Sequence, residues 1–122
     1  MSKSEEKISK VSEIKFEISL DEQNIPVGLH WEAEDSAFNQ KKACKALLIA
    51  LWDGQTKNTL RIDLWTKEME VNEMNHFFFQ TLVTMAETYQ RATGNADGSK
   101  KMAEFAQEFA EDLKLFPQNK KG

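Results

Sequence analysis

Few side chains in this 122-residue chain could take part in catalysis. The chain has two histidines, His30 and His76, and a single cysteine, Cys44. One residue separates His30 from Glu32, and in a strand this spacing places an imidazole and a carboxylate on one face, where they could act in general acid–base chemistry. A reaction also needs a cleft and a positioned nucleophile or oxyanion site, which a flat sheet does not offer. We therefore predict that the chain is not an enzyme and has no catalytic residue.

Metal and cofactor binding are not expected either. The two histidines lie far apart, and the chain lacks the His-x-x-x-His and Cys-x-x-Cys spacings of zinc sites. Its five glycines form neither a dinucleotide-binding nor a Walker sequence. No Gly-x-Ser-x-Gly elbow is present. Cys44 lies among alanines and leucines, which predicts a small buried hydrophobe, and His76 is predicted to be an ordinary helix residue.

The segment 59–67 carries the strongest pattern. Its aliphatic residues alternate with Arg61, Asp63 and Trp65, which predicts a strand with one core face and one open face. Two interpretations of the open face remain: a solvated ladder of salt bridges, or a docking surface, because Trp and Arg are frequent at interface hot spots. With His30 and Glu32 expected on the same open face, the candidate partner surface comprises Arg61, Asp63, Trp65, His30 and Glu32.

The elements that would position these residues follow from hydrophobic periodicity. Strict alternation predicts strands at 14–20, 27–33 and 59–65, the first two forming a hairpin around Pro26. Apolar residues at three- and four-residue spacing predict helices at 39–52, 71–92 and 99–116, the last one capped by Ser99. The predicted fold class is α+β: a small three-stranded sheet, made of the hairpin plus one further strand, with helices packed on one face. The predicted order is strand-strand-helix-strand-helix-helix.

The length favours one domain. We expect a flexible N-terminal tail at 1–11, a single α+β domain at 12–117 and a polar C-terminal tail at 118–122. The three consecutive phenylalanines at 77–79 cover most of a helix circumference, so at least one must point away from the sheet. Two destinations are open for it: burial against the last helix, or a contact with a partner or a second copy of the chain.

Charge and composition limit the classes of partner. Sixteen basic residues against 20 acidic ones give a net charge of −4, which argues against a protein that binds nucleic-acid phosphates. No apolar run approaches the ~20 residues of a membrane span, and no secretory signal is visible at the N-terminus. The lone cysteine favours a reducing compartment. The chain is therefore expected to be soluble and cytoplasmic, without membrane insertion.

Several stretches together resemble one protein family. They begin with residues 12–22 and the Pro26 turn, continue through the central motifs, and extend downstream to 69–77 and 85–93. The most specific motifs are Trp31-Glu32-Ala33, Ala50-Leu51-Trp52-Asp53 and Thr59-Leu60-Arg61-Ile62-Asp63-Leu64-Trp65-Thr66-Lys67. This pattern resembles the GldC family of gliding motility-associated proteins over roughly residues 12–116.

The resemblance implies an accessory, non-enzymatic role in bacterial gliding. Members of that family are understood as cytoplasmic proteins whose loss impairs gliding, and no catalytic residues are established for them. The partners it implies are other proteins of the gliding machinery, or the chain itself as a homo-oligomer. Two alternatives from other classes remain open: a small-molecule-binding or enzymatic domain that uses His30 and Glu32, and a chaperone-like oligomer with apolar grooves.

Overall fold

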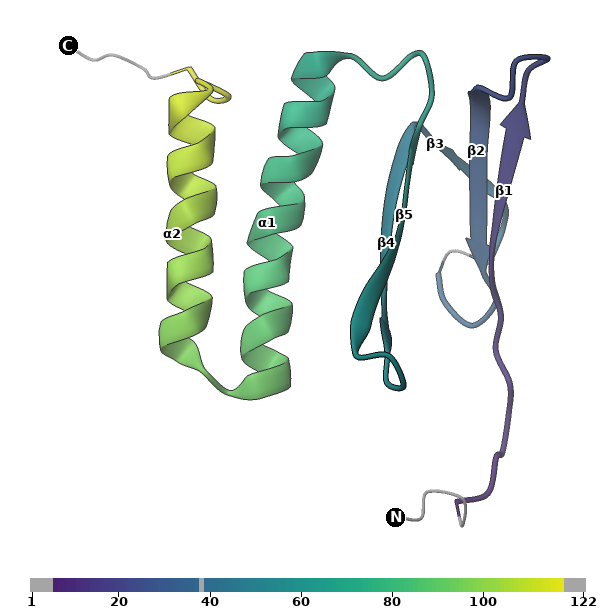
Figure 1. Ribbon diagram of the computed structural model, residues 1–122, viewed down its shortest axis with the longest axis horizontal. Helices are drawn as coiled ribbons and strands as arrows, with labels where there is room; N and C mark the ends of the chain where they lie inside the picture. Colours follow the sequence, from purple (N-terminus) through teal and green to yellow (C-terminus); the bar gives the residue numbers. More distant parts are fainter. Residues whose placement is uncertain (1–5, 38, 118–122) are drawn as a thin grey trace. The chain divides into compact units, whose positions relative to one another are not determined.

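A computed structural model describes residues 6–37 and 39–117 (Figure 1). The chain divides into two compact units, residues 1–69 and 70–122, and each is described by itself. Of the described residues, those in the first unit form all the strands and those in the second form the two helices. Residues 6–11 form no helix or strand, whereas the rest of the predicted N-terminal tail and the predicted C-terminal tail lie outside the described residues.

The first unit begins with a three-stranded antiparallel sheet. Strands β1 (Ile14–Leu20) and β2 (Pro26–Ala33) form the predicted hairpin, and the short strand β3 (Lys42–Cys44) adds to the other edge of β2. Alternation gives this sheet one apolar face, formed by Ile14, Phe16, Ile18, Leu29, Trp31 and Cys44, and one largely polar face. Leu29, in the central strand, is only 1% exposed and is the most buried side chain of the unit.

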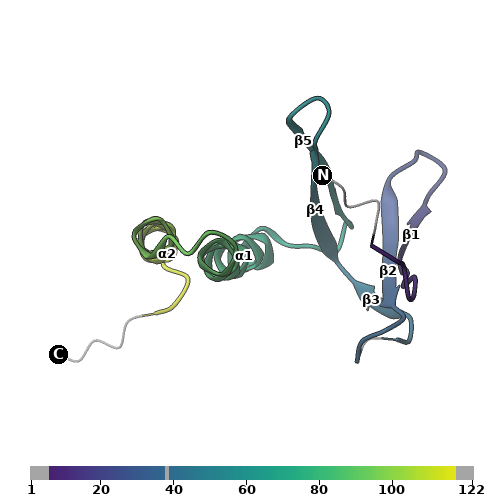
Figure 2. The same ribbon diagram turned by 90° about the horizontal axis from the view of Figure 1, so that it is seen from below.

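A second sheet follows directly. Strand β4 (Ala46–Asp53) and strand β5 (Asn58–Trp65) form a regular antiparallel hairpin, in register from Ala46 opposite Trp65 to Asp53 opposite Asn58. Figure 2 shows β3 leading straight into β4, with Lys45 as the residue between them. Leu47 is buried here, whereas most of the other apolar side chains of this hairpin are partly or well exposed.

The helix predicted at 39–52 is wrong, because β3 and β4 occupy this segment. Residues 46–52 are apolar without interruption, and such a run fits a strand as well as a helix. Gly54 lies in the turn of the β4–β5 hairpin. The strand predicted at 59–65 is confirmed as β5, but it pairs with β4 and not with the first hairpin.

The second unit is a helical hairpin. Helix α1 (Val71–Thr93) begins with a capping box between Glu70 and Glu73 and ends at Gly94, which has a left-handed φ of 72°. Helix α2 (Ala96–Asp112) lies beside it, as both views show (Figures 1 and 2). Small buried residues form the contact between the two helices. One of them is Ser99, whose hydroxyl donates a hydrogen bond to the Ala86 carbonyl at 2.8 Å.

Two details of the helical unit refine the predictions. Helix α2 begins three residues before the predicted Ser99 cap, because the Asn95 side chain accepts a hydrogen bond from the Gly98 amide at 2.9 Å. Among the three phenylalanines, Phe79 packs edge-on against Phe116 with ring centroids 5.3 Å apart, whereas Phe78 is well exposed. Phe79 is thus packed within the helical unit, whereas a contact of Phe78 with a partner or a second copy stays a prediction.

The α+β class and the three-stranded sheet are confirmed. In the part of the chain that the structure describes, five strands are followed by two helices, and every strand pair is antiparallel. The packing of helices on a sheet face and the single domain at 12–117 stay predictions. No helix in the described ranges is long and apolar enough to cross a membrane.

Candidate functional site

The β4–β5 hairpin presents a face with exposed tryptophans at both ends. Its register places Trp65 opposite Ala46 at one end and Trp52 opposite Thr59 at the other. The two indoles are 55% and 67% exposed. Between them the same face carries Leu48, Ala50, Arg61 and Asp63, and we call this set, with the two tryptophans, the tryptophan face.

The two charged residues of the tryptophan face, Arg61 and Asp63, form a weak ion pair. Arg61 and Asp63 lie two residues apart on β5, and their nearest side-chain atoms, a guanidinium nitrogen and a carboxylate oxygen, are 3.5 Å apart. Both side chains are solvated, with 66% and 36% of their surface exposed, so water and salt screen the pair. Such an exposed pair contributes little to folding.

The other predicted surface residues lie in the three-stranded sheet. Its polar face has Lys15 opposite Glu32 and Glu17 opposite His30. Lys41 donates to the Glu17 carboxylate at 2.9 Å, and this hydrogen bond holds the pKa of Glu17 below its usual value while it raises the pKa of Lys41. His30 and Glu32 therefore share a face with an exposed network of charges.

The predicted surface is thus divided between two sheets. The structure brings His30 and Glu32 together on β2, and it brings Arg61, Asp63 and Trp65 together on β5. The prediction placed the two groups on one sheet face, but they lie in different sheets. Sequence reasoning missed Trp52 and Leu48 because it assigned them to a helix. The signal that could have found them is the uninterrupted apolar run at 46–52, which is typical of a strand with two apolar faces.

The remaining chemically versatile residues have ordinary surroundings. Cys44 lies opposite Leu29 in the β2–β3 ladder, and burial raises the pKa of its thiol, which disfavours the reactive thiolate. The His76 ring packs edge-on against Phe116, with centroids 5.5 Å apart. Within residues 6–37 and 39–117, no three His, Cys, Asp or Glu side chains come together as metal ligands.

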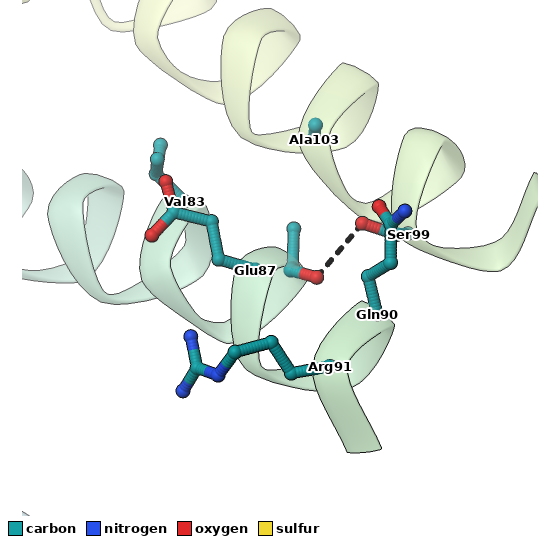
Figure 3. Close-up of a pocket in the computed structure, with 7 residues that line it drawn as sticks. Val83, Glu87, Gln90, Arg91, Ser99 and Ala103 are labelled. Atoms are coloured by element: carbon teal, nitrogen blue, oxygen red, sulfur yellow. Dashed lines mark hydrogen bonds between the residues drawn. The ribbon is translucent and has the colours of Figure 1, made fainter. Parts of the chain in front are cut away.

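A hollow of about 650 Å³ lies along the helical hairpin (Figure 3). Glu87, Gln90 and Arg91 border it from α1, and Ser99 and Ala103 border it from α2. The Ser99 hydroxyl is already bonded to the Ala86 carbonyl, as the dashed line in Figure 3 marks, and is not poised as a nucleophile. The hollow is open to solvent, and we assign it no ligand.

Comparison with known protein families identifies the family to which the chain is similar. A family described as gliding motility-associated protein GldC-like matches residues 26–115. This range includes β2 to β5 and both helices, and therefore the whole tryptophan face. No curated protein and no solved structure matches the chain.

Proposed function

The chain belongs to the GldC-like family of gliding motility-associated proteins, and from this premise we propose that it serves the gliding machinery as a non-enzymatic, cytoplasmic protein-interaction module. Its partner is another protein of that machinery, which it binds through the tryptophan face. This proposal assigns the protein a role in holding components together.

The exposed tryptophans carry the proposal. An indole is large, and its transfer from water into an interface is strongly favourable, so two of them on one small hairpin face are unusual for a surface that only meets solvent. Trp and Arg are also the residue types most enriched among interface hot spots. Leu48 and Ala50 supply apolar surface between the indoles, and Arg61 and Asp63, which lie opposite them on β5, supply charges that a partner can pair.

The enzymatic alternative has less support. His30 and Glu32 lie on a sheet face beside Lys15, Glu17 and Lys41, where Glu17 is already engaged by a lysine. The hollow on the helical hairpin is lined by none of these five residues. A binding function needs only the exposed surface, whereas a reaction would need an enclosed site around His30 and Glu32.

The test is replacement of the chromosomal gene in a gliding bacterium with a Trp52→Ala/Trp65→Ala variant. Removal of both indoles should weaken partner binding about tenfold or more, so we expect reduced spreading and loss of the proteins that co-purify with the wild type. The matched control is Phe105→Ala in α2, since Phe105 is as exposed as Trp65, at 55%. This control should glide and capture partners normally.

Full gliding by the double tryptophan variant, with unchanged partners, would overturn the proposal. An equal defect in Phe105→Ala would move the interaction to the helical unit. The variants His30→Ala and Glu32→Gln complete the series: a gliding defect confined to these two would favour the enzymatic alternative.

A further inference from the structure

Strand β5 has an unused edge. Among the strands of the described chain, its one hydrogen-bonded neighbour is β4, and the sheet that they form has just two strands. Two-stranded sheets are marginally stable in water and generally need a third strand or a covering layer. Edge strands are usually protected from further pairing by proline, a bulge or repelling charges. The regular β4–β5 ladder contains neither proline nor a bulge.

Charges that protect an edge strand repel a second copy of it, whereas the charges of β5 attract one. Around Ile62, the segment Leu60-Arg61-Ile62-Asp63-Leu64 has the same polarity in both directions, with opposite charges at equivalent positions. If two copies pair antiparallel about a two-fold axis at Ile62, each Arg61 lies opposite the Asp63 of the other copy. Each Leu60 then lies opposite a Leu64. Both kinds of cross-strand pair are favourable.

The backbone agrees with this register. The Thr66 amide donates to the Lys45 carbonyl at 2.9 Å, next to the pair of Ala46 with Trp65. In an antiparallel ladder the residues that bond to one neighbour alternate with those that bond to the other. The backbone groups of the even-numbered residues therefore face β4, while those of Arg61 and Asp63 face the free edge. In the two-fold pairing these two residues form the hydrogen-bonded pairs, and Ile62 meets its copy in a non-hydrogen-bonded pair.

We propose that two copies of this chain form a symmetric dimer by antiparallel pairing of β5 with β5 about a two-fold axis at Ile62. The product is a four-stranded sheet, which is an isologous form of strand addition. One face of it is entirely aliphatic along the hairpin, contributed in each copy by Leu47, Ile49, Leu51, Leu60, Ile62 and Leu64. In the single chain Ile62 is still 48% exposed, which leaves apolar surface for the pairing to cover.

Strand β1 is the matched control, because its segment Ile14-Lys15-Phe16-Glu17-Ile18 has a similar polarity pattern around Phe16. It already belongs to a three-stranded sheet, and Lys41 occupies the Glu17 carboxylate at 2.9 Å. Strand β4 is the other edge of the hairpin, but it has no charge between Ala46 and Trp52 that would fix a register. The inference does not rest on a role in gliding.

The first test reverses one charge at a time. In Arg61→Asp, and likewise in Asp63→Arg, the two-fold pairing sets like charges opposite each other, so each variant alone should dimerise at least about tenfold more weakly than the wild type. Mixed together, the two variants are complementary and should form a heterodimer. The double variant Arg61→Asp/Asp63→Arg should dimerise as the wild type does. Sedimentation equilibrium measures all four samples, and Glu17→Lys is the control that should keep the wild-type dissociation constant.

The second test does not depend on charge. The α-carbons of a non-hydrogen-bonded antiparallel pair are about 4.5 Å apart, which suits a disulfide. In a Cys44→Ser background, Ile62→Cys should oxidise to a covalent dimer, whereas Phe16→Cys should form no covalent dimer. A monomeric wild type at high concentration, failure of the mixed charge variants to associate, or cross-linking through position 16 in place of 62 would each overturn the proposal. The dimer is measured on the isolated protein and the partner by gliding and co-purification, so the two proposals can fail separately.

Discussion

The two hairpins of the first unit share a turn design and differ in how many strands surround them. In β1–β2 the Asp21 carboxylate accepts hydrogen bonds from the Gln23 and Ile25 amides at 2.8 and 3.0 Å. In β4–β5 the Asp53 carboxylate accepts them from the Gln55 amide at 2.9 Å and the Thr56 hydroxyl at 3.0 Å. Each turn also contains one non-glycine residue with positive φ.

The surroundings of the hairpins differ. Strand β2 is a central strand and buries Leu29 almost completely, whereas the edge strand β1 leaves most of its apolar side chains exposed. The β4–β5 hairpin consists of two edge strands and, apart from the buried Leu47, leaves its aliphatic side chains partly exposed and its tryptophans exposed on the other face. The comparison teaches that turn chemistry is sufficient to define a hairpin, whereas the deepest burial occurs in the strand that has a neighbour on both edges. The β4–β5 hairpin is accordingly where we place both a partner and a second copy.

The largest expected difference between the hairpins is in the cost of removing a leucine side chain. Leu29→Ala should lower the free energy of unfolding by about 2–4 kcal/mol, because it empties a fully enclosed site. Leu60 is 53% exposed, and Leu60→Ala in dilute protein should cost less than about 1 kcal/mol. Urea unfolding followed by circular dichroism measures both.

Protein concentration sharpens this prediction. If β5 pairs with its copy, Leu60 is partly covered by Leu64 of the other chain, so the cost of Leu60→Ala should grow as the concentration rises, while that of Leu29→Ala should change less. Equal costs for the two variants in dilute protein would show that the two hairpins do not differ in burial as the structure describes.

The turn carboxylates should behave alike in acid and differently in salt. Hydrogen bonds, chiefly from the Ile25 amide to Asp21 and from the Gln55 amide to Asp53, lower the pKa of both carboxyls in the folded state. A carboxyl with a lowered folded pKa stabilises the fold above its unfolded pKa of about 3.9, and this stabilisation is lost as the pH falls through the folded value. Asp21→Ala and Asp53→Ala should therefore reduce stability at neutral pH, less than Leu29→Ala does, and hardly at all in strong acid.

Salt separates the two turns. The Asp21 carboxylate also lies 3.3 Å from the Lys67 ammonium, an exposed ion pair that salt should screen, whereas Asp53 is held by donors of its own turn. Added salt should reduce the effect of Asp21→Ala and leave that of Asp53→Ala nearly unchanged. Thermal unfolding of both variants over a range of pH and ionic strength checks this, and equal salt dependence would contradict it.

The same comparison explains what could be predicted from the sequence. Strands β1, β2 and β5 were found because polar and apolar residues alternate along them, since each has one polar face. Strand β4 was missed because Ala46 to Trp52 are all apolar, and a run without alternation does not reveal its period. A strand that is apolar on both faces is typical of sheets covered on both sides. The apolar run of β4, which led to the wrong prediction, is thus also the feature that makes the β4–β5 hairpin the candidate interface.

Only the β5 part of the candidate site was predicted, because only β5 shows the alternation of polar and apolar residues. Arg61, Asp63 and Trp65 were identified because their alternation with leucine and isoleucine is visible in β5. Trp52 was left out because the apolar run at 46–52 was assigned to a helix. Its position opposite Thr59 depends in addition on strand pairing, a long-range property that local periodicity does not encode. His30 and Glu32 were correctly placed on one face of β2, but their separation from the β5 residues again depended on pairing.

The smallest expected effect concerns the residues with positive φ in the two turns, Asn24 at 63° and Lys57 at 59°. A left-handed conformation costs ordinary residues about 1–2 kcal/mol, while asparagine tolerates it better and glycine adopts it freely. Allowing for the greater flexibility of glycine in the unfolded chain, Lys57→Gly should raise the free energy of unfolding by about 0.5–1 kcal/mol. Asn24→Gly should change it by less than about 0.5 kcal/mol, because asparagine already suits that position.

A glycine placed elsewhere in the β4–β5 turn is the control for this effect. Gln55 does not have a positive φ, so Gln55→Gly should give no stabilisation and instead add flexibility to the unfolded chain. Urea midpoints of the three variants, measured in dilute protein so that self-association does not contribute, rank the effects. A gain from Lys57→Gly alone means that the two turns differ in backbone strain although their aspartates act alike. Equal gains at positions 24 and 57 would mean that the turns are equivalent in strain as well, and that the hairpins differ only in the strands around them.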